Sequence, residues 1–298
     1  MNRQTDQNIM LQRFQAMIRE RKGLIGCGLG FSAALHSQGK LAYAGSDRWG
    51  QGEGQDWSEV TSLVCDADET VVLLNDGTLR FAGRQTIDNR FTSLSHVRTV
   101  ACVQGHMAAL LGNGRVIVGS ERSQAFHAEI SEWPTVRDIC CGVRFTAGLT
   151  ADGRVALAGG SRRLRAASAS WKDITGIFTD FEGNHLYAVN QDGRLFATTR
   201  IPSAAKSWKG LVFVAVYRDE LWGISTGGQL RTTKAGLADT DMGRHFVACA
   251  VSDRHAIALS RDGHVTAWGE NDFGQCDTRR FGALFDNFEE FAADRRTI

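Results

Sequence analysis

Proline is nearly absent from this sequence, with 2 residues in 298, and no stretch contains the roughly 18 consecutive apolar residues that a membrane-spanning helix requires. The first residues also lack a long apolar run, so we expect neither a secretory signal nor a membrane span. An excess of one charge is missing too, because 34 Lys and Arg balance 33 Asp and Glu. Since binding to a phosphate backbone draws on a strong basic excess, this balance argues against nucleic acid as the partner.

The seven cysteines are odd in number and none of them forms a CxxC pair. A disulfide framework or a structural zinc site would need paired cysteines at regular short spacings. We therefore expect free thiols in a reducing compartment, with the cytoplasm as the location, and we expect no cofactor and no tightly bound metal.

Glycine, in contrast, is abundant, with 33 residues, and one glycine recurs at intervals of 35 to 40 residues. An apolar residue stands four positions before and two positions after each copy, as Leu35 and Leu41 do around Gly39. Even offsets on both sides of a turn predict a β-hairpin with one buried face, and this period is typical of propellers. The seven turn glycines are Gly39, Gly77, Gly114, Gly153, Gly193, Gly228 and Gly263.

These repeats predict an all-β fold, a single closed seven-bladed β-propeller over residues 24–298. Residues 1–23 precede the repeats, and apolar residues at helical spacing between positions 6 and 21 predict a short amphipathic N-terminal helix, which packs either on the propeller or on a partner. The C-terminal segment FEEFAAD, from Phe288, is expected to complete the last blade, because a ring hides its sheet edges only when it closes.

Four of the cysteines share one repeat position, twelve residues before the turn glycine. They could form a metal or redox cluster, or they could be small, soft residues on the innermost strand, where the blades crowd around the axis. The repeat distributes them over consecutive blades, which favours the structural interpretation. The four are Cys27, Cys65, Cys102 and Cys141.

The last repeat, residues 247–277, carries the most specific motif: a histidine, an Asp-Gly turn, an aromatic-glycine pair and a Gly-Gln loop. This pattern resembles the regulator of chromosome condensation family, in the style of its short-repeat bacterial members. The resemblance implies a seven-bladed propeller that serves as a scaffold for protein binding. The first repeat agrees in part, through Gly39, Gly45, Gly50 and Gln51. The matching residues of the last repeat are His255, Leu259, Asp262, Gly263, Trp268, Gly269, Asn271, Gly274 and Gln275.

The eukaryotic namesake of that family is a nucleotide exchange factor for a small GTPase, and it uses a wedge element beyond its propeller repeats. Copies of 35 to 40 residues leave no room for such an insertion here. Exchange activity on a GTPase is therefore not expected of this chain.

Eight residues before the turn glycines, five of the seven copies carry a histidine or a glutamate. Such a ring near the axis could bind a metal or transfer protons, which leaves a propeller lyase or hydrolase as an alternative function. In the resembled family the histidine at this position is a structural hydrogen-bonding residue, so we assign no catalytic residue. The candidates for the axial ring are Glu69, His106, His185, Glu220 and His255.

A second candidate site is the basic segment SRRLRAASASWK after the fourth repeat, which has no acidic residue until Asp173. We interpret it as a loop that faces an acidic protein partner, because loops on a rigid scaffold usually carry recognition. The alternative is a solvated loop without a partner. The candidate partner-binding residues are Arg162, Arg163, Arg165, Lys172, Arg200 and Lys206.

Taken together, these patterns favour a non-catalytic platform for protein-protein interaction. A third hypothesis is a glycan-binding lectin, since LYAVNQDGRLFAT and LWGISTGGQLRTT resemble tectonin-type repeats and seven tryptophans could stack on sugars. An enzyme should show a deep axial pocket with converging polar groups, a lectin repeated exposed tryptophans, and a protein binder a broad face.

Overall fold

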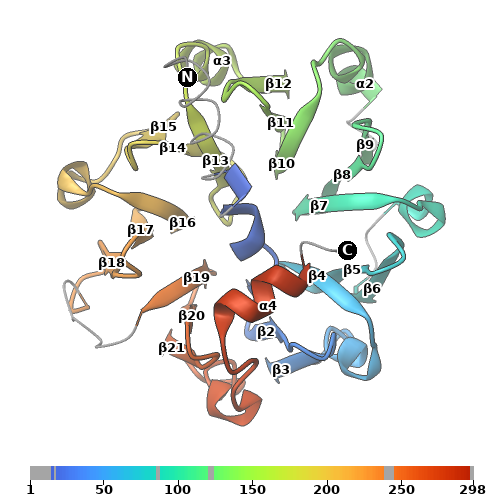
Figure 1. Ribbon diagram of the computed structural model, residues 1–298, viewed down its shortest axis with the longest axis vertical. Coiled ribbons are helices and arrows are strands. Elements are labelled where there is room, and N and C mark those ends of the chain that lie inside the picture. The colour runs from blue at the N-terminus through green and yellow to red at the C-terminus, as the bar shows by residue number, and fades with distance from the viewer. Residues whose placement is uncertain (1–14, 17, 85–87, 120–123, 238–244, 296–298) are drawn as a thin grey trace.

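The computed structural model describes residues 15–16, 18–84, 88–119, 124–237 and 245–295. Its strands form seven sheets of three consecutive antiparallel strands, arranged as blades around a common axis (Figure 1). The first four sheets are β1 (Ile25–Gly28), β2 (Phe31–Leu35) and β3 (Leu41–Gly45); β4 (Val60–Asp66), β5 (Glu69–Leu74) and β6 (Leu79–Gly83); β7 (Val97–Val103), β8 (His106–Leu111) and β9 (Val116–Gly119); β10 (Val136–Gly142), β11 (Phe145–Thr150) and β12 (Val155–Gly159). The other three are β13 (Ile174–Thr179), β14 (Leu186–Asn190) and β15 (Leu195–Ala197); β16 (Leu211–Tyr217), β17 (Glu220–Ser225) and β18 (Leu230–Thr232); β19 (Phe246–Val251), β20 (His255–Ser260) and β21 (Val265–Gly269).

The predicted glycine turns join the second and third strands of every sheet. All seven turn glycines have a left-handed backbone, with φ between 68° and 83°, which a glycine adopts without steric cost. The apolar residues on either side are direct cross-strand partners, as with Leu35 and Leu41 in the first sheet and Leu259 and Val265 in the last. The prediction of seven hairpins is confirmed.

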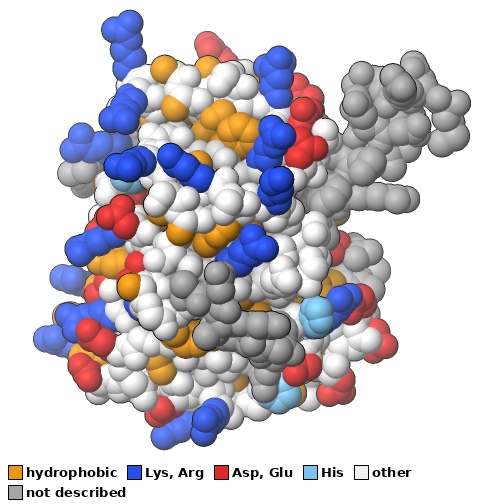
Figure 2. All heavy atoms as spheres, turned by 90° about the vertical axis from the view of Figure 1, so that its left-hand side faces the viewer, with side chains coloured by type: hydrophobic (Ala, Val, Ile, Leu, Met, Phe, Trp, Pro, Cys, Tyr) orange, Lys and Arg blue, Asp and Glu red, His pale blue; other side chains and the backbone are white. Residues whose placement is uncertain are grey.

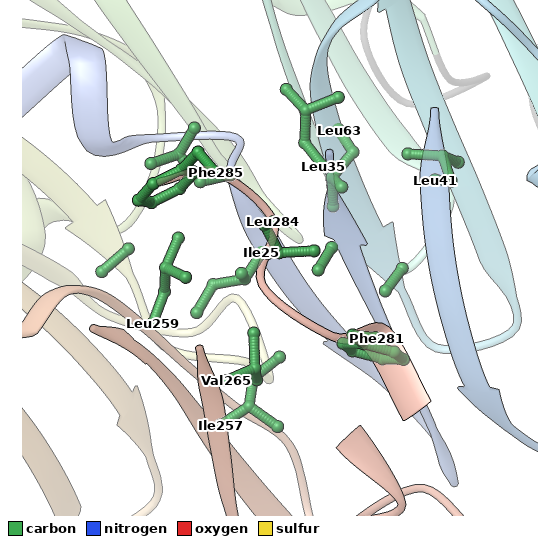
Figure 3. Close-up of a cluster of buried hydrophobic side chains, with 14 of the residues drawn as sticks. Ile25, Leu35, Leu41, Leu63, Ile257, Leu259, Val265, Phe281, Leu284 and Phe285 are labelled. Atoms are coloured by element: carbon green, nitrogen blue, oxygen red, sulfur yellow. The ribbon is translucent and has the colours of Figure 1, made fainter. Parts of the chain in front are cut away.

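Neighbouring sheets contact each other through their inner strands, and β19 of the last sheet contacts β1 of the first. The chain beyond β21 strengthens this last seam. The Leu284 N–H donates to the Gly263 carbonyl at 2.8 Å, and the Leu284 carbonyl accepts from the Ser37 N–H at 2.8 Å. Figure 3 shows Leu284 and Phe285 among apolar side chains of both sheets. The last and first sheets are therefore held together by the C-terminal segment.

The C-terminal segment FEEFAAD, expected from the sequence to complete the last blade, forms a helix instead. After the 3-10 turn η5 (Thr278–Phe281), helix α4 (Phe288–Arg295) begins with Glu289 and Glu290 in its first turn, where acidic side chains favour a helix. Phe288, Phe291 and Ala292 are buried, and their spacing places them on one helical face. The prediction was wrong because this apolar face covers the core from outside the sheets, and the last sheet has three strands without it.

Residues 15–16 and 18–21 are helical and lie near the axis (Figure 1). Ile18 is 1% exposed and belongs to a core cluster with Phe178 and Phe213. Lys22 Nζ forms an ion pair with Asp138 and donates a hydrogen bond to the Ile177 carbonyl at 2.8 Å. This part of the predicted N-terminal helix packs on the sheets, while residues 6–14 and 17 lie outside the described residues.

Short helices occupy the connections between sheets, at the outer edge of the molecule (Figure 1). Across the described ranges, no helix combines the length and the apolar character needed to cross a membrane. The connecting helices are η1 (Glu53–Asp56), η2 (Asn89–Ser93), α2 (Gln124–Ser131), α3 (Arg162–Ser168) and η4 (Ser203–Ser207).

Candidate functional site

The inner strands surround an axial cavity of about 750 Å³. Its wall combines apolar side chains with polar and charged ones, among them Lys22, Asp66, Asp138 and Asp180. Six of the seven cysteines line it, whereas none of the five predicted ring residues does. The cysteines of the wall are Cys27, Cys65, Cys102, Cys140, Cys141 and Cys249.

Burial raises the pKa of every thiol that lines the cavity, which favours the protonated form. Burial raises the pKa of Cys65 and of Cys140 to about 12, because the interior disfavours the thiolate. Cys27 and Cys141 lie directly across the sheet from the hydroxyls of Ser32 and Thr146. These positions fit the structural interpretation of the repeated cysteines.

Four of the predicted ring residues begin the middle strands of their sheets, and His185 directly precedes β14. His106 Nε2 lies 2.9 Å from Thr146 Oγ1 of the next sheet. His255 Nε2 makes the equivalent contact with Ser32 Oγ of the first sheet, also at 2.9 Å. Burial lowers the pKa of both histidines to about 4, so they are neutral at physiological pH.

His185 and Glu220 have partners from their own repeats. His185 Nδ1 lies 2.7 Å from Asp180 Oδ2, and Lys234 Nζ donates to Glu220 at 2.9 Å. These four ring candidates thus have separate partners, and no contact between any two of them is seen in the described part of the chain.

One group in the described part of the chain has a geometry that could hold a metal ion: ligand atoms of Asp66, Glu69 and Cys102 lie within 4.8 Å of one another. Asp66 is already engaged, because its carboxylate accepts the Ala67 N–H at 2.8 Å and the Gly105 N–H at 3.1 Å. Sequence reasoning singled out Glu69 and Cys102 by their repeat positions but missed Asp66.

The basic segment after the fourth sheet is not a loop as predicted, because most of it forms helix α3. Ser161 caps this helix by accepting the Leu164 N–H at 3.2 Å, and Leu164 and Ser168 are buried beneath it. Arg165 Nη2 pairs with Glu129 Oε2 of α2 at 2.5 Å, and this hydrogen bond lowers the pKa of the Glu129 carboxyl. A cap, two alanines and one buried leucine are enough to favour a helix here.

The other five predicted partner-binding residues are exposed and form no ion pair within the described ranges. They extend from α3 and the start of the fifth sheet to η4. Figure 2 views this side of the molecule, and Lys and Arg side chains gather over its upper part. We call these residues the basic edge: Arg162, Arg163, Lys172, Arg200 and Lys206.

The tryptophans do not form a repeated surface. Six of the seven are buried or half-buried, and several fill gaps against glycines of the sheets; a Cβ on Gly148 would lie 2.7 Å from the Trp133 ring. Trp49 is the exposed one, at 42%.

Comparison with known proteins agrees with this architecture. Residues 246–275 match the family described as regulator of chromosome condensation (RCC1) repeat. The chain is 23% identical over 350 aligned residues to the X-linked retinitis pigmentosa GTPase regulator homolog of Caenorhabditis elegans. That alignment covers 91% of this chain, which spans 25% of the length of that relative.

Two solved structures show the same fold. The ectodomain of the Physcomitrella patens receptor kinase CR4 has a TM-score of 0.64 at 15% identity, covering 83% of this chain and 72% of that one. The CRINKLY WD40 ectodomain of the Arabidopsis thaliana receptor kinase ACR4 has a TM-score of 0.63 at 14% identity, covering 82% and 93%. The chain therefore contains one segment, residues 246–275, that matches the RCC1 repeat, within seven sheets of three strands that fit the architecture of a seven-bladed β-propeller.

Proposed function

We propose that this chain is a non-catalytic platform for protein-protein interaction and that its basic edge contacts an acidic partner. The observation that carries the proposal is the set of five exposed cations that have no carboxylate partner in the described ranges. Surface cations that no carboxylate neutralises produce a positive potential, which steers an acidic protein toward them. Recognition at such a surface draws on electrostatic complementarity and needs no converging catalytic groups.

The two alternative functions have weaker support. An enzyme would bring acid-base groups together in a pocket, whereas His106 and His255 are neutral and lie between sheets, outside the axial cavity. A lectin of the tectonin type would repeat its exposed tryptophans, whereas Trp49 has no exposed counterpart among the described residues.

The proposal also includes the closure of the ring, the division of the chain and its location. We propose a closed ring, supported by the contact between β19 and β1 and by the hydrogen bonds of Leu284. The division into a helical extension, residues 1–23, and a propeller, residues 24–298, stays a prediction. A reducing cytoplasmic location is supported by the free thiols. Nucleic acid binding, GTPase exchange activity, a cofactor and a metal are not part of the proposal.

Quantitative affinity capture tests the basic edge. The wild-type chain, the variant R162E/R163E/K172E and the control K40E/R80E/R115E serve as baits, with captured proteins measured by mass spectrometry. Arg165 is left unchanged because it pairs with Glu129, whereas Lys40, Arg80 and Arg115 are exposed cations of other sheets without a described ion pair.

We expect acidic proteins to be captured by the wild type and the control and to be reduced at least tenfold on the edge variant. Because exposed substitutions change stability by about 0.5 kcal/mol or less, all three baits should stay folded. Equal capture by the edge variant and the wild type would remove the basic edge from the proposed function.

A further inference from the structure

Three large apolar side chains are exposed in the described part of the chain: Leu29 at 40%, Trp49 at 42% and Phe273 at 59%. Leu29 and Phe273 lie beside Gly30, in the turn between β1 and β2, and Trp49 stands on a loop that is tied to this turn. Leu29 precedes this glycine, and the Phe273 ring lies so close that a Cβ on Gly30 would be 2.9 Å from it. The loop of Trp49 is tied to the same turn, because the Ser46 N–H donates to the Gly30 carbonyl at 2.9 Å. We call Leu29, Trp49 and Phe273 the apolar strip.

The two aromatic side chains of the strip sit on two loops of the same construction. The Trp49 N–H donates to Gln51 Oε1 at 2.8 Å, and the Phe273 N–H donates to Gln275 Oε1 at 2.9 Å. Gln51 and Gln275 are buried, at 2% and 0% exposed, so each anchors its loop from below. An aromatic group that is held in place before binding loses little conformational entropy when a partner covers it.

The charge around the strip is polarised. The guanidinium carbons of Arg48 and Arg84 lie 5.2 and 5.1 Å from the centre of the Trp49 ring. Arg48 has no ion pair in the described ranges, and Arg84 approaches a carboxylate only at 3.9 Å, from Asp68. At the other end, the exposed Asp272 adjoins Phe273.

Two of the nearby acidic groups have hydrogen-bond partners of their own. Asp47 Oδ1 accepts the Gly52 N–H at 2.7 Å, and Glu270 Oε2 accepts from Arg254 Nη1 at 2.9 Å. A ligand that covers the strip therefore meets two arginines beside the Trp49 ring, Arg48 without an ion pair in the described ranges and Arg84 only loosely paired with Asp68. Beside Phe273 it meets the exposed carboxylate of Asp272.

We propose that the apolar strip docks a segment of a partner protein in which an acidic residue adjoins bulky apolar residues. The acidic side chain meets Arg48 and Arg84, and the apolar side chains cover Leu29 and Phe273. Contiguous exposed apolar groups mark interaction sites, and aromatic anchors with flanking arginines supply much of the affinity at such sites. The inference rests on the proposed protein-binding function and adds a second contact surface, on the first and last sheets.

A phage-displayed library of random peptides, about 12 residues each, is the probe. It is selected on the full chain, and the enriched sequences are synthesised with a fluorophore and measured by anisotropy. We expect enriched peptides that place Asp or Glu next to aromatic or aliphatic residues. Their affinity should fall at least tenfold for W49A/F273A and for R48E/R84E, and it should be unchanged for D272N and for the basic-edge variant R162E/R163E/K172E.

The variants separate the possible outcomes. Failure to enrich any peptide, or equal binding to W49A/F273A and the wild type, would overturn the strip as a docking surface. If the enriched peptides bind R48E/R84E as tightly as the wild type, the partner segment does not need an acidic residue, and that part of the inference fails. If binding is lost only in the basic-edge variant, the strip inference fails while the proposed function stands. Thermal melting confirms that each variant is folded, as expected for substitutions at exposed positions.

Discussion

His255 Nε2 lies 2.9 Å from Ser32 Oγ, so a buried hydrogen bond crosses from the last sheet to the first. The Ser32 hydroxyl donates to the Gln275 carbonyl at 2.8 Å, which makes His255 Nε2–H the donor toward Ser32. Nδ1 then accepts from the Ser252 hydroxyl at 2.8 Å. The histidine that the family resemblance marks as structural thus links the two ends of the chain.

Removing the Ser32 hydroxyl should weaken this seam. We expect Ser32→Ala to lower the free energy of unfolding by about 1–3 kcal/mol, because the buried Nε2–H of His255 loses its acceptor. Thr146→Val removes the equivalent acceptor of His106 between the third and fourth sheets and should cost a similar amount. Urea denaturation measures both. An unchanged midpoint for Ser32→Ala would show that the bond does not stabilise the seam.

Acid should destabilise the fold through the two buried histidines. Their pKa is about 4 in the folded chain, below the ordinary value of 6.5, so the unfolded chain binds more protons between these values. Their contribution is complete above pH 6.5 and is lost as the pH falls toward 4, by roughly 3 kcal/mol for each histidine. Unfolding of the wild type and of His255→Gln from pH 7 to 4.5 tests this. Parallel pH profiles of the two proteins would contradict it.

Glu59 and Gly210 occupy the same place before an inner strand and share a left-handed backbone, with φ of 64° and 66°. Their carbonyls accept equivalent hydrogen bonds, from the Asn75 and Thr226 N–H groups. Because a side chain is strained in this conformation, Glu59→Gly should stabilise the fold by up to about 1 kcal/mol. Gly210→Ala should destabilise the fold by about 1 kcal/mol. An unchanged free energy of unfolding for this variant would show that a side chain is not strained at this position.

Thiol labelling should follow burial. Cys276 lies outside the axial cavity and is half-buried, and burial raises its pKa less than that of the cavity thiols. A brief maleimide pulse on the folded protein at pH 8, read by peptide mass spectrometry, should label Cys276 first. Labelling of Cys65 or Cys140 at the same rate would mean that the cavity wall opens readily.

The hairpins could be predicted from the sequence because a period-two pattern around a glycine is local information, as at Leu35, Gly39 and Leu41. Helix α4 could not, since Phe288 and Phe291 suit a strand or a helix and the choice depends on the core they cover. The pairing of Arg165 with Glu129 joins two separate connections, which no local pattern shows. The exposure of Trp49 and Phe273 depends on loop geometry, although the resemblance marked their neighbours Gly50, Gln51, Gly274 and Gln275.

The association rate of a captured partner is the most direct test of the proposed function. Surface plasmon resonance measures the wild type and R162E/R163E/K172E at low salt and near 1 M salt, where the Debye length is about 3 Å. If the basic edge steers an acidic partner, the variant should associate at least tenfold more slowly at low salt, and the difference should vanish at high salt. If the variant associates as fast as the wild type at low salt, the basic edge does not contact the partner.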